Sequence, residues 1–269
     1  MIASYILLKL HDGGFFANKK SGFGLRILIF RIILRNRAFF HHHVFWEIGL
    51  LMISYYWFDM DHTLIDNDCD VSWKHFVVLK KMADAGETER LADHYYRQYL
   101  AGTLDPTEFM DFQLREFRGN TPETMAALAM EHFETMVKPK LYRDAAALCH
   151  KLAANRLPLA IVTSTNTVIA RPVADFLGFS ELFGAQPEIK NNRYTGTLTG
   201  VYPAGPGKAV ILQNYCKEHH LSPDQFAYYG DSIHDHFILE LVGEPHAVNP
   251  GEQLSAVARE KHWDIIHFQ

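Results

Sequence analysis

The sequence predicts an α/β fold in which a doubly wound, Rossmann-like parallel sheet carries an inserted all-helical segment. Short apolar runs of strand length alternate with segments of helical periodicity along the second half of the chain, which predicts a parallel sheet. About 70 residues after the first of these runs show helical periodicity and no strand pattern, which predicts the insert. With 269 residues and an apolar fraction of 48%, the chain can form one large packed domain or two small ones.

The first predicted strand runs from Met52 to Phe58 and ends in two carboxylates, Asp59 and Asp61. Side chains two residues apart on an extended backbone point the same way, so both carboxylates should face one point beyond the strand. Ligands of open α/β sheets bind outside the carboxyl ends of the strands. Two like charges held this close need a cation, a shared proton or solvent. The alternative is a strand that runs into an Asp-rich turn, because a pattern this short also arises by chance.

Residues 68–138 carry the predicted helical insert. Trp73, Phe76 and Val77 fall on one helical face. Asp105 and Thr121 each precede a proline, and a capping residue followed by proline marks the start of a helix. Because the insert directly follows the acidic loop, we interpret it as a lid over that loop, with an ordinary helical bundle as the alternative.

Helices and strands alternate after residue 138. We predict helices at residues 142–155, 168–177, 205–218 and 237–242, and strands at 157–162, 226–229 and 246–249. Asn191 and Asn192 predict a hairpin turn within residues 182–200. The predicted core domain therefore consists of residues 52–67 and 139–269, and the insert of residues 68–138.

Residues 1–51 differ from the rest of the chain in charge. They hold seven Lys or Arg and two acids, a net charge of +5, which leaves −10 for the remainder of a chain whose total is −5. Neither of their apolar stretches reaches the roughly 18 uninterrupted apolar residues of a membrane span, so we expect no stable membrane insertion. We interpret residues 1–51 as an extension outside the functional domain, with Met52 as the natural start. An Arg-rich organelle transit peptide is the alternative, although serine is scarce.

The overall composition limits the partners and the compartment. A net charge of −5 argues against a nucleic-acid partner. The three cysteines show no CxxC pair and no disulfide-like spacing, which favours a reducing compartment and hence a cytoplasmic protein. The sequence makes no prediction of the oligomeric state.

Four polar clusters follow predicted strands or open predicted helices. They are Asp59/Asp61/Thr63, Thr163/Ser164, Lys208 and Asp231/Asp235. Each cluster taken singly has a common structural explanation: Thr163 would cap a helix, and Lys208 would be a solvated surface lysine. Their joint order along the chain favours a catalytic interpretation.

The order and spacing of these clusters resemble the haloacid dehalogenase superfamily of phosphohydrolases over about residues 53–265. The superfamily motifs hDxDxT, hhhT, a downstream Lys and GDSxxD are all present and in order. The helical insert resembles the superfamily's first cap class. Residues 58–65 together with Gly230-Asp231-Ser232 look most like subfamily IB, which contains phosphoserine phosphatase.

The resemblance implies roles for the acidic residues. Asp59 would be the nucleophile that forms an aspartyl-phosphate, and Asp61 the general acid and then the general base. The implied cofactor is Mg²⁺, bound by the Asp59 carboxylate, the Asp61 backbone carbonyl and the Asp231 carboxylate. Asp235 would support the site by orienting the waters of the metal or Lys208.

The resemblance also implies a phosphate site and a substrate class. Thr163, Ser164 and Lys208 would bind the phosphate oxygens. Subfamily IB has an amine-binding Glu nine residues after the nucleophile, where this chain has Asp68. We therefore expect Asp68 to bind a cationic group of a small phosphorylated metabolite.

Two departures from subfamily IB leave the substrate open. Thr163-Ser164-Thr165 stands in place of Ser-Gly-Gly, and His234 in place of Asn. Phosphoserine is the first expected substrate, and histidinol phosphate or another small phosphate ester is the second. A phosphotransferase that uses the same intermediate and a non-catalytic phosphate- or metal-binding module are the competing functions.

Overall fold

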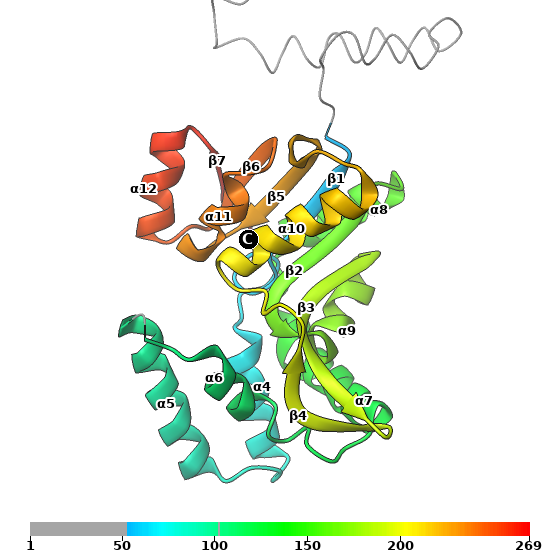
Figure 1. Ribbon diagram of the computed structural model, residues 1–269, viewed down its shortest axis with the longest axis vertical. Helices are drawn as coiled ribbons and strands as arrows, with labels where there is room; N and C mark the ends of the chain where they lie inside the picture. Colours follow the sequence, from blue (N-terminus) through cyan, green and yellow to red (C-terminus); the bar gives the residue numbers. More distant parts are fainter. Residues whose placement is uncertain (1–52, 102) are drawn as a thin grey trace, which may run out of the picture. The chain divides into compact units, whose positions relative to one another are not determined.

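A seven-stranded sheet organises the part of the chain that this computed structural model describes, residues 53–101 and 103–269 (Figure 1). Across the sheet the strands lie in the order β4 (Arg193–Thr199), β3 (Glu181–Lys190), β2 (Leu159–Asn166), β1 (Tyr55–Phe58), β5 (Phe226–Gly230), β6 (Glu244–Val248) and β7 (Asp264–Ile266). All neighbouring strands pair in parallel except β3 and β4, which form the predicted antiparallel hairpin. The extension predicted for residues 1–51 lies outside the described residues.

Helices cover both faces of this sheet, as a doubly wound fold requires. In the central strand β1, Phe58 and Trp57 point to opposite faces and are both buried. Phe58 packs into the core cluster that includes α8 (Arg143–Ala154) and α9 (Thr167–Leu177). Trp57 packs into a second cluster formed with α10 (Pro206–His219), α11 (His236–Leu239) and α12 (Glu252–Lys261). The α/β class and its parallel sheet are therefore as predicted.

Three features of the core differ from the predicted elements. Strand β2 continues through Thr163 to Asn166 instead of ending at Val162, because Asn166 still pairs with Ala185 of β3. Helix α12 and strand β7 were not predicted. A three-residue strand at a sheet edge is too short to show alternation, so its pairing with β6 depends on the tertiary structure.

The segment between β1 and α8 is helical, as predicted. It contains α4 (Cys69–Leu79), α5 (Ala85–Ala101), α6 (Pro106–Gln113) and α7 (Pro122–His132), followed by the helical turns Phe133–Val137 and Lys138–Lys140. The predicted caps form: the Asp105 carboxylate accepts from the backbone of Thr107 and Glu108, and the Thr121 hydroxyl accepts from Thr124. Helices α4, α5 and α6 lie beyond the end of β1, at the lower left of Figure 1, and α7 packs on α9.

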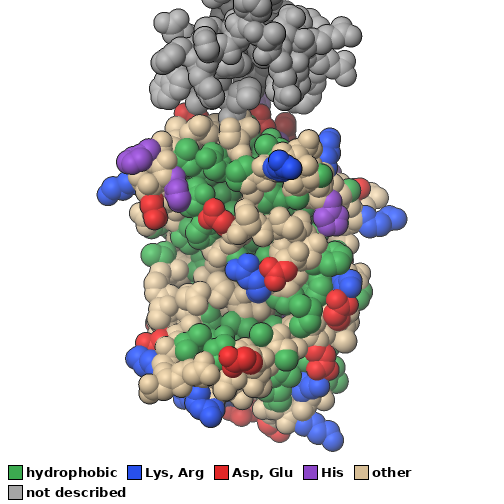
Figure 2. All heavy atoms as spheres, turned by 90° about the vertical axis from the view of Figure 1, so that its right-hand side faces the viewer, with side chains coloured by type: hydrophobic (Ala, Val, Ile, Leu, Met, Phe, Trp, Pro, Cys, Tyr) green, Lys and Arg blue, Asp and Glu red, His purple; other side chains and the backbone are tan. Residues whose placement is uncertain are grey.

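The outer surface carries both signs of charge. On the face shown in Figure 2, basic and acidic side chains are interspersed among apolar and neutral ones and are not gathered by sign. None of the helices in the described residues is long and apolar enough to cross a membrane. The three cysteines, Cys69, Cys149 and Cys216, are free and buried.

One histidine is buried where the insert packs on itself. His132, at the end of α7, is fully inaccessible, and its ring lies against those of Trp73 and Phe76. Its Nε2 atom is 2.9 Å from the Ser72 hydroxyl oxygen, and its Nδ1 atom has no partner among the described residues. Burial lowers the pKa of His132 to about 4, because the charged ring would lose its hydration.

Acid should therefore destabilise the fold through His132. At pH values between the usual histidine pKa and the lowered one, the unfolded chain binds a proton that the folded protein does not. The free energy of unfolding therefore decreases as the pH is lowered through this range. We expect the wild type to lose about 2 kcal/mol more than His132→Gln between about pH 7 and pH 5. Denaturant unfolding at several pH values measures this difference, and parallel pH curves for the two proteins would contradict it.

Candidate active site

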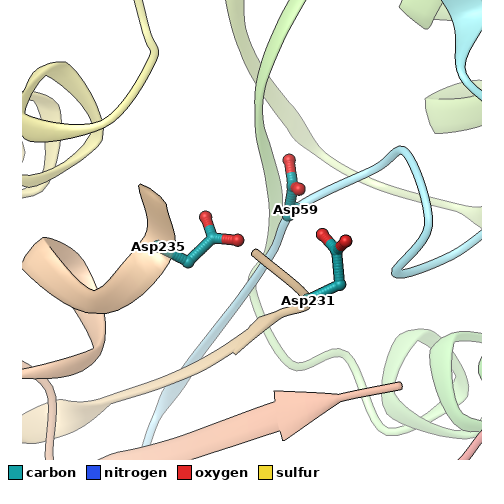
Figure 3. Close-up of side chains that lie close together, drawn as sticks. All are labelled: Asp59, Asp231 and Asp235. Atoms are coloured by element: carbon teal, nitrogen blue, oxygen red, sulfur yellow. The ribbon is translucent and has the colours of Figure 1, made fainter. Parts of the chain in front are cut away.

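Two acidic residues lie side by side because their strands are neighbours. Asp59 follows β1 directly and Asp231 follows β5, and these strands pair in parallel with Phe58 opposite Tyr229. The Asp59 backbone N–H donates to the Tyr229 carbonyl over 2.8 Å, which holds the two strand ends level. Asp235, from the helical turn Ile233–Asp235 before α11, points toward both. One carboxylate oxygen from each of the three lies within 4.8 Å of the others (Figure 3).

Lys208 joins two of these carboxylates. Its Nζ atom, in the first turn of α10, lies 2.7 Å from Oδ1 of Asp59 and 2.7 Å from Oδ1 of Asp235. The Tyr228 hydroxyl also donates to Oδ1 of Asp235, and the Ser232 N–H donates to its Oδ2. Lys208 is only 5% exposed, so the interpretation as a solvated surface lysine is wrong. Asp235, whose two oxygens are both occupied, holds Lys208 in place.

The burial of these charges shifts their pKa values. Burial raises the pKa of Asp59 to about 6, against the opposing charge of Lys208. Burial, with the charges of Asp59 and Asp235, raises the pKa of Asp231 to about 9. Burial alone would lower the pKa of Lys208, but Asp235 and Asp59 hold it above its usual value. Three carboxylates therefore share one ammonium group, and a further cation would relieve the repulsion among them.

The donor set at this point suits a hard divalent cation. Carboxylate oxygens are ligands that Mg²⁺ prefers, and those of Asp59 and Asp231 lie close together. The Thr63 hydroxyl, 3.4 Å from Oδ1 of Asp231, helps to orient that carboxylate. The residues therefore fit the metal that the resemblance implies.

Asp61 is held by hydrogen bonds to both of its carboxylate oxygens. The Cys69 backbone N–H, at the start of α4, donates to Oδ1 over 2.8 Å, and the Thr165 hydroxyl donates to Oδ2 over 2.7 Å. Burial, followed by the charges of Asp68 and Asp59, raises the pKa of Asp61 to about 7. A carboxyl group with such a pKa can both give and accept a proton near neutral pH.

The sequence reasoning missed Thr165 as a residue that contacts Asp61. Thr163 and Thr165 lie two residues apart on β2 and so share a face of the sheet, which is the signal that could have identified it. Thr163 is fully buried, and its hydroxyl accepts from the Thr165 backbone N–H. Ser164 is half-buried, and strand alternation directs it to the opposite face.

Asp68 lies at the edge of this group. It is exposed and caps α4, where its Oδ1 accepts from the Val71 backbone N–H over 3.0 Å. Its charge still acts on Asp61, whose pKa it helps to raise. The structure therefore brings Asp68 near the acidic loop, on its solvent side.

Two glycines permit the close approach of these segments. A Cβ atom on Gly230 would lie 2.7 Å from the Asp235 carboxylate, and one on Gly207 would lie 2.0 Å from the Tyr202 carbonyl oxygen. Neither distance is tolerable for a real side chain. Both positions therefore require glycine if Asp235 and Lys208 are to stay where they are.

Comparisons with known proteins agree with this geometry. The family model of the haloacid dehalogenase-like hydrolases matches residues 57–240. A histidinol-phosphatase of Neisseria meningitidis serogroup C is 32% identical over 218 residues, which cover 79% of this chain and 97% of the relative. A phosphoserine phosphatase of Mycobacterium tuberculosis is 24% identical over 222 residues, which cover 79% of this chain and 70% of that protein.

Solved structures show the same likeness. A Bordetella pertussis protein described as having unknown function matches with a TM-score of 0.74 and 29% identity, over 80% of this chain and 98% of that one. A substrate-bound phosphoserine phosphatase matches with a TM-score of 0.57 and 15% identity, over 79% of this chain and 92% of that one, which is a likeness of fold. The chain belongs to the haloacid dehalogenase-like hydrolases and is a phosphatase of that family.

Proposed function

We propose that this protein is a magnesium-dependent phosphomonoesterase that hydrolyses a small amine-bearing phosphate ester, with L-histidinol phosphate as the first candidate. The observation that carries the proposal is the buried chain from Asp59 through Lys208 to Asp235, with Asp231 beside it. This arrangement places a nucleophile, a phosphate-binding cation and a metal site at one point. The competing non-catalytic module has no need of Asp61 held by Cys69 and Thr165.

The chemistry divides between Asp59 and Asp61. A carboxylate oxygen of Asp59 attacks phosphorus, the bond to the ester oxygen breaks, and Asp61 gives its proton to the leaving alkoxide. Asp61 then takes a proton from the water that attacks the aspartyl-phosphate, which frees Asp59 and releases phosphate. Lys208, 2.7 Å from Asp59, binds a phosphate oxygen, as does Thr163, whereas Ser164 points to the opposite face of β2. Bound Mg²⁺, held by Asp59, Asp231 and the Asp61 carbonyl, would neutralise charge on the phosphate.

The local charge favours a substrate that carries cations and no carboxylate. Burial, followed by the charges of Asp68 and Asp61, raises the pKa of Asp70, so three acids lie within electrostatic reach of one another where α4 begins. Histidinol phosphate has an amine and an imidazole but no carboxylate, whereas the carboxylate of phosphoserine would meet these acids. The 32% identical relative named histidinol-phosphatase also supports histidinol phosphate ahead of phosphoserine. Phosphoserine is therefore the second candidate, which reverses the order expected from the sequence.

Two further assignments accompany this proposal. Residues 68–138 act as a cap that closes over the site and excludes bulk water, because the first turn of α4 already touches Asp61. The three free, buried cysteines favour a reducing compartment such as the cytoplasm.

Phosphate release from a panel of esters tests the proposal. The panel is histidinol phosphate, phosphoserine, a sugar phosphate and p-nitrophenyl phosphate, each with Mg²⁺ and with a chelator. We expect histidinol phosphate to be hydrolysed fastest and the chelator to abolish every activity. Preference for the sugar phosphate would overturn the substrate assignment, and full activity in chelator would overturn the metal. Product analysis with and without an acceptor alcohol separates hydrolysis from phosphotransfer.

Asp231→Asn should raise the Mg²⁺ concentration needed for half-maximal activity by at least about tenfold, because an amide is a weaker ligand than a carboxylate. Titration of activity with Mg²⁺ measures this value. Thr63→Val removes only the hydroxyl beside Asp231 and should raise it less. An unchanged Mg²⁺ requirement in Asp231→Asn would show that Asp231 is not a metal ligand.

A further inference from the structure

One buried carboxyl group near the site has an oxygen without a hydrogen-bond partner among the described residues. Asp70, in the first turn of α4, is 8% exposed, and its Oδ1 atom has no hydrogen-bond partner among the described residues. A buried carboxylate without a partner is costly, since it has lost its hydration and gained nothing in return. The usual role of an acid in the first turn of a helix is to face the helix dipole, and an exposed side chain performs that role without this cost.

The neighbouring lysine lowers the pKa of Asp70 through space but forms no ion pair with it. Lys74 lies one turn further along α4, where an ion pair with Asp70 would be ordinary. Its ammonium group instead donates to the backbone carbonyls of Phe112 and Gln113 and forms a 2.6 Å ion pair with Glu116. An ammonium group has three donors, so these three acceptors use all of them. Oδ1 of Asp70 is therefore left without a hydrogen-bond partner among the described residues.

Asp70 lies on the side of the site where the leaving alcohol must be. The general acid Asp61 has to reach the ester oxygen, so the alcohol part of the substrate lies beside Asp61. The N–H of Cys69, the residue before Asp70, donates to the Asp61 carboxylate over 2.8 Å. The first turn of α4 therefore borders the space that the alcohol occupies.

Tyr202, in the loop before α10, is within electrostatic reach of this turn. Burial, followed by the charge of Asp70, raises the pKa of Tyr202, and the charge of Lys208 opposes the rise. The Tyr202 side chain is thus within electrostatic reach of both the cap residue and the phosphate-binding lysine.

We propose that Asp70 binds the cationic group of the leaving alcohol, so that the substrate provides the partner that Oδ1 lacks in the free protein. This inference rests on the proposed function and names the residue that sets its substrate class. Asp68, which is exposed and already caps α4, then adds negative charge at the edge of the site but does not make the main contact with the cationic group.

Asp70→Asn tests the inference through a ratio of two activities. We expect kcat/KM for histidinol phosphate, divided by kcat/KM for p-nitrophenyl phosphate, whose leaving group carries no cation, to fall roughly 10- to 100-fold, mainly through KM. Histidinol, which carries the cations without the phosphate, should inhibit p-nitrophenyl phosphate hydrolysis by the wild type and far less by Asp70→Asn. The thermal midpoint should not fall, because the lost charge has no partner in the free protein; a purely structural role would lower it and leave the ratio unchanged.

Two matched variants serve as comparisons. Asp105→Asn makes the same chemical change at an exposed cap of α6 and should leave the ratio at the wild-type value. Asp68→Asn should lower the ratio less than Asp70→Asn does. A larger effect of Asp68→Asn would overturn the inference and make Asp68 the main contact.

The remaining outcomes separate this inference from the proposed function. If the wild type prefers histidinol phosphate but Asp70→Asn lowers both activities equally, the role of Asp70 fails and the function stands. If the wild type hydrolyses p-nitrophenyl phosphate with Mg²⁺ but no amine-bearing ester, the proposed substrate class and the role of Asp70 both fail. Only the assignment as a Mg²⁺-dependent phosphatase then remains.

Discussion

Asp59→Asn is expected to abolish turnover, with a loss of more than about 10⁴-fold in kcat, because removal of a covalent nucleophile has costs of this order. An amide oxygen is a poor nucleophile and a weaker metal ligand than a carboxylate. The change also removes one of the two carboxylates that Lys208 contacts. Phosphate release with excess Mg²⁺ measures the loss.

Rapid quenching with labelled substrate tests the same residue more directly. Label should remain covalently attached to the wild type after denaturation and should be absent from Asp59→Asn. Asp66→Asn, at an exposed position in the same loop, is the matched control for the loss of one acid. Wild-type activity or a covalent phosphate on Asp59→Asn would show that another residue is the nucleophile.

Asp61→Asn is expected to slow both halves of the reaction by about 10²–10⁴-fold, the usual contribution of general acid–base catalysis. The amide can neither protonate the leaving alkoxide nor accept a proton from water. The metal should be bound nearly as before, because the ligand assigned to Asp61 is its backbone carbonyl. Single-turnover measurements separate the two steps, and a Mg²⁺ titration tests the metal.

The leaving group provides a finer test of Asp61. A nitrophenolate departs without protonation, so Asp61→Asn should slow the first step less with p-nitrophenyl phosphate than with an alkyl ester. Thr165→Val removes the 2.7 Å hydrogen bond to Oδ2 of Asp61 but keeps the carboxyl group, and its effect should be smaller. Equal slowing of the first step for both esters would argue against proton donation by Asp61.

Several features of the fold could be predicted because they depend on local patterns. The alternation of apolar strands with amphipathic helices predicts a parallel sheet, and its strand ends then gather at one edge. Asp59 and Asp231 lie together for this reason: each follows a central strand, and those strands pair in register. Capping by Asp105 and Thr121 is local as well, since each side chain bonds a backbone N–H two or three residues away.

Other features depend on contacts between segments that are distant in the sequence. The hydrogen bond from Thr165 to Asp61 joins residues 104 positions apart, so no local pattern predicts that these two side chains meet, although strand alternation places Thr165 on the same face of β2 as Thr163. Strand β7 exists because β6 offers an edge to pair with, not because its three residues have a strand pattern of their own.

The three acids Asp66, Asp68 and Asp70 show most clearly which features depend on the sequence alone and which depend on the tertiary structure. The sequence by itself determined that an acidic run follows the Asp59/Asp61/Thr63 cluster and that a helix begins within it. Only the tertiary structure decided which acid is buried. Helix α4 begins at Cys69, so Asp68 stays outside as the exposed cap and Asp70 is buried. Each of the three positions holds the same residue type, so the sequence does not tell them apart. Their burial depends on how the helix packs, and a packed helix buries only one of its faces.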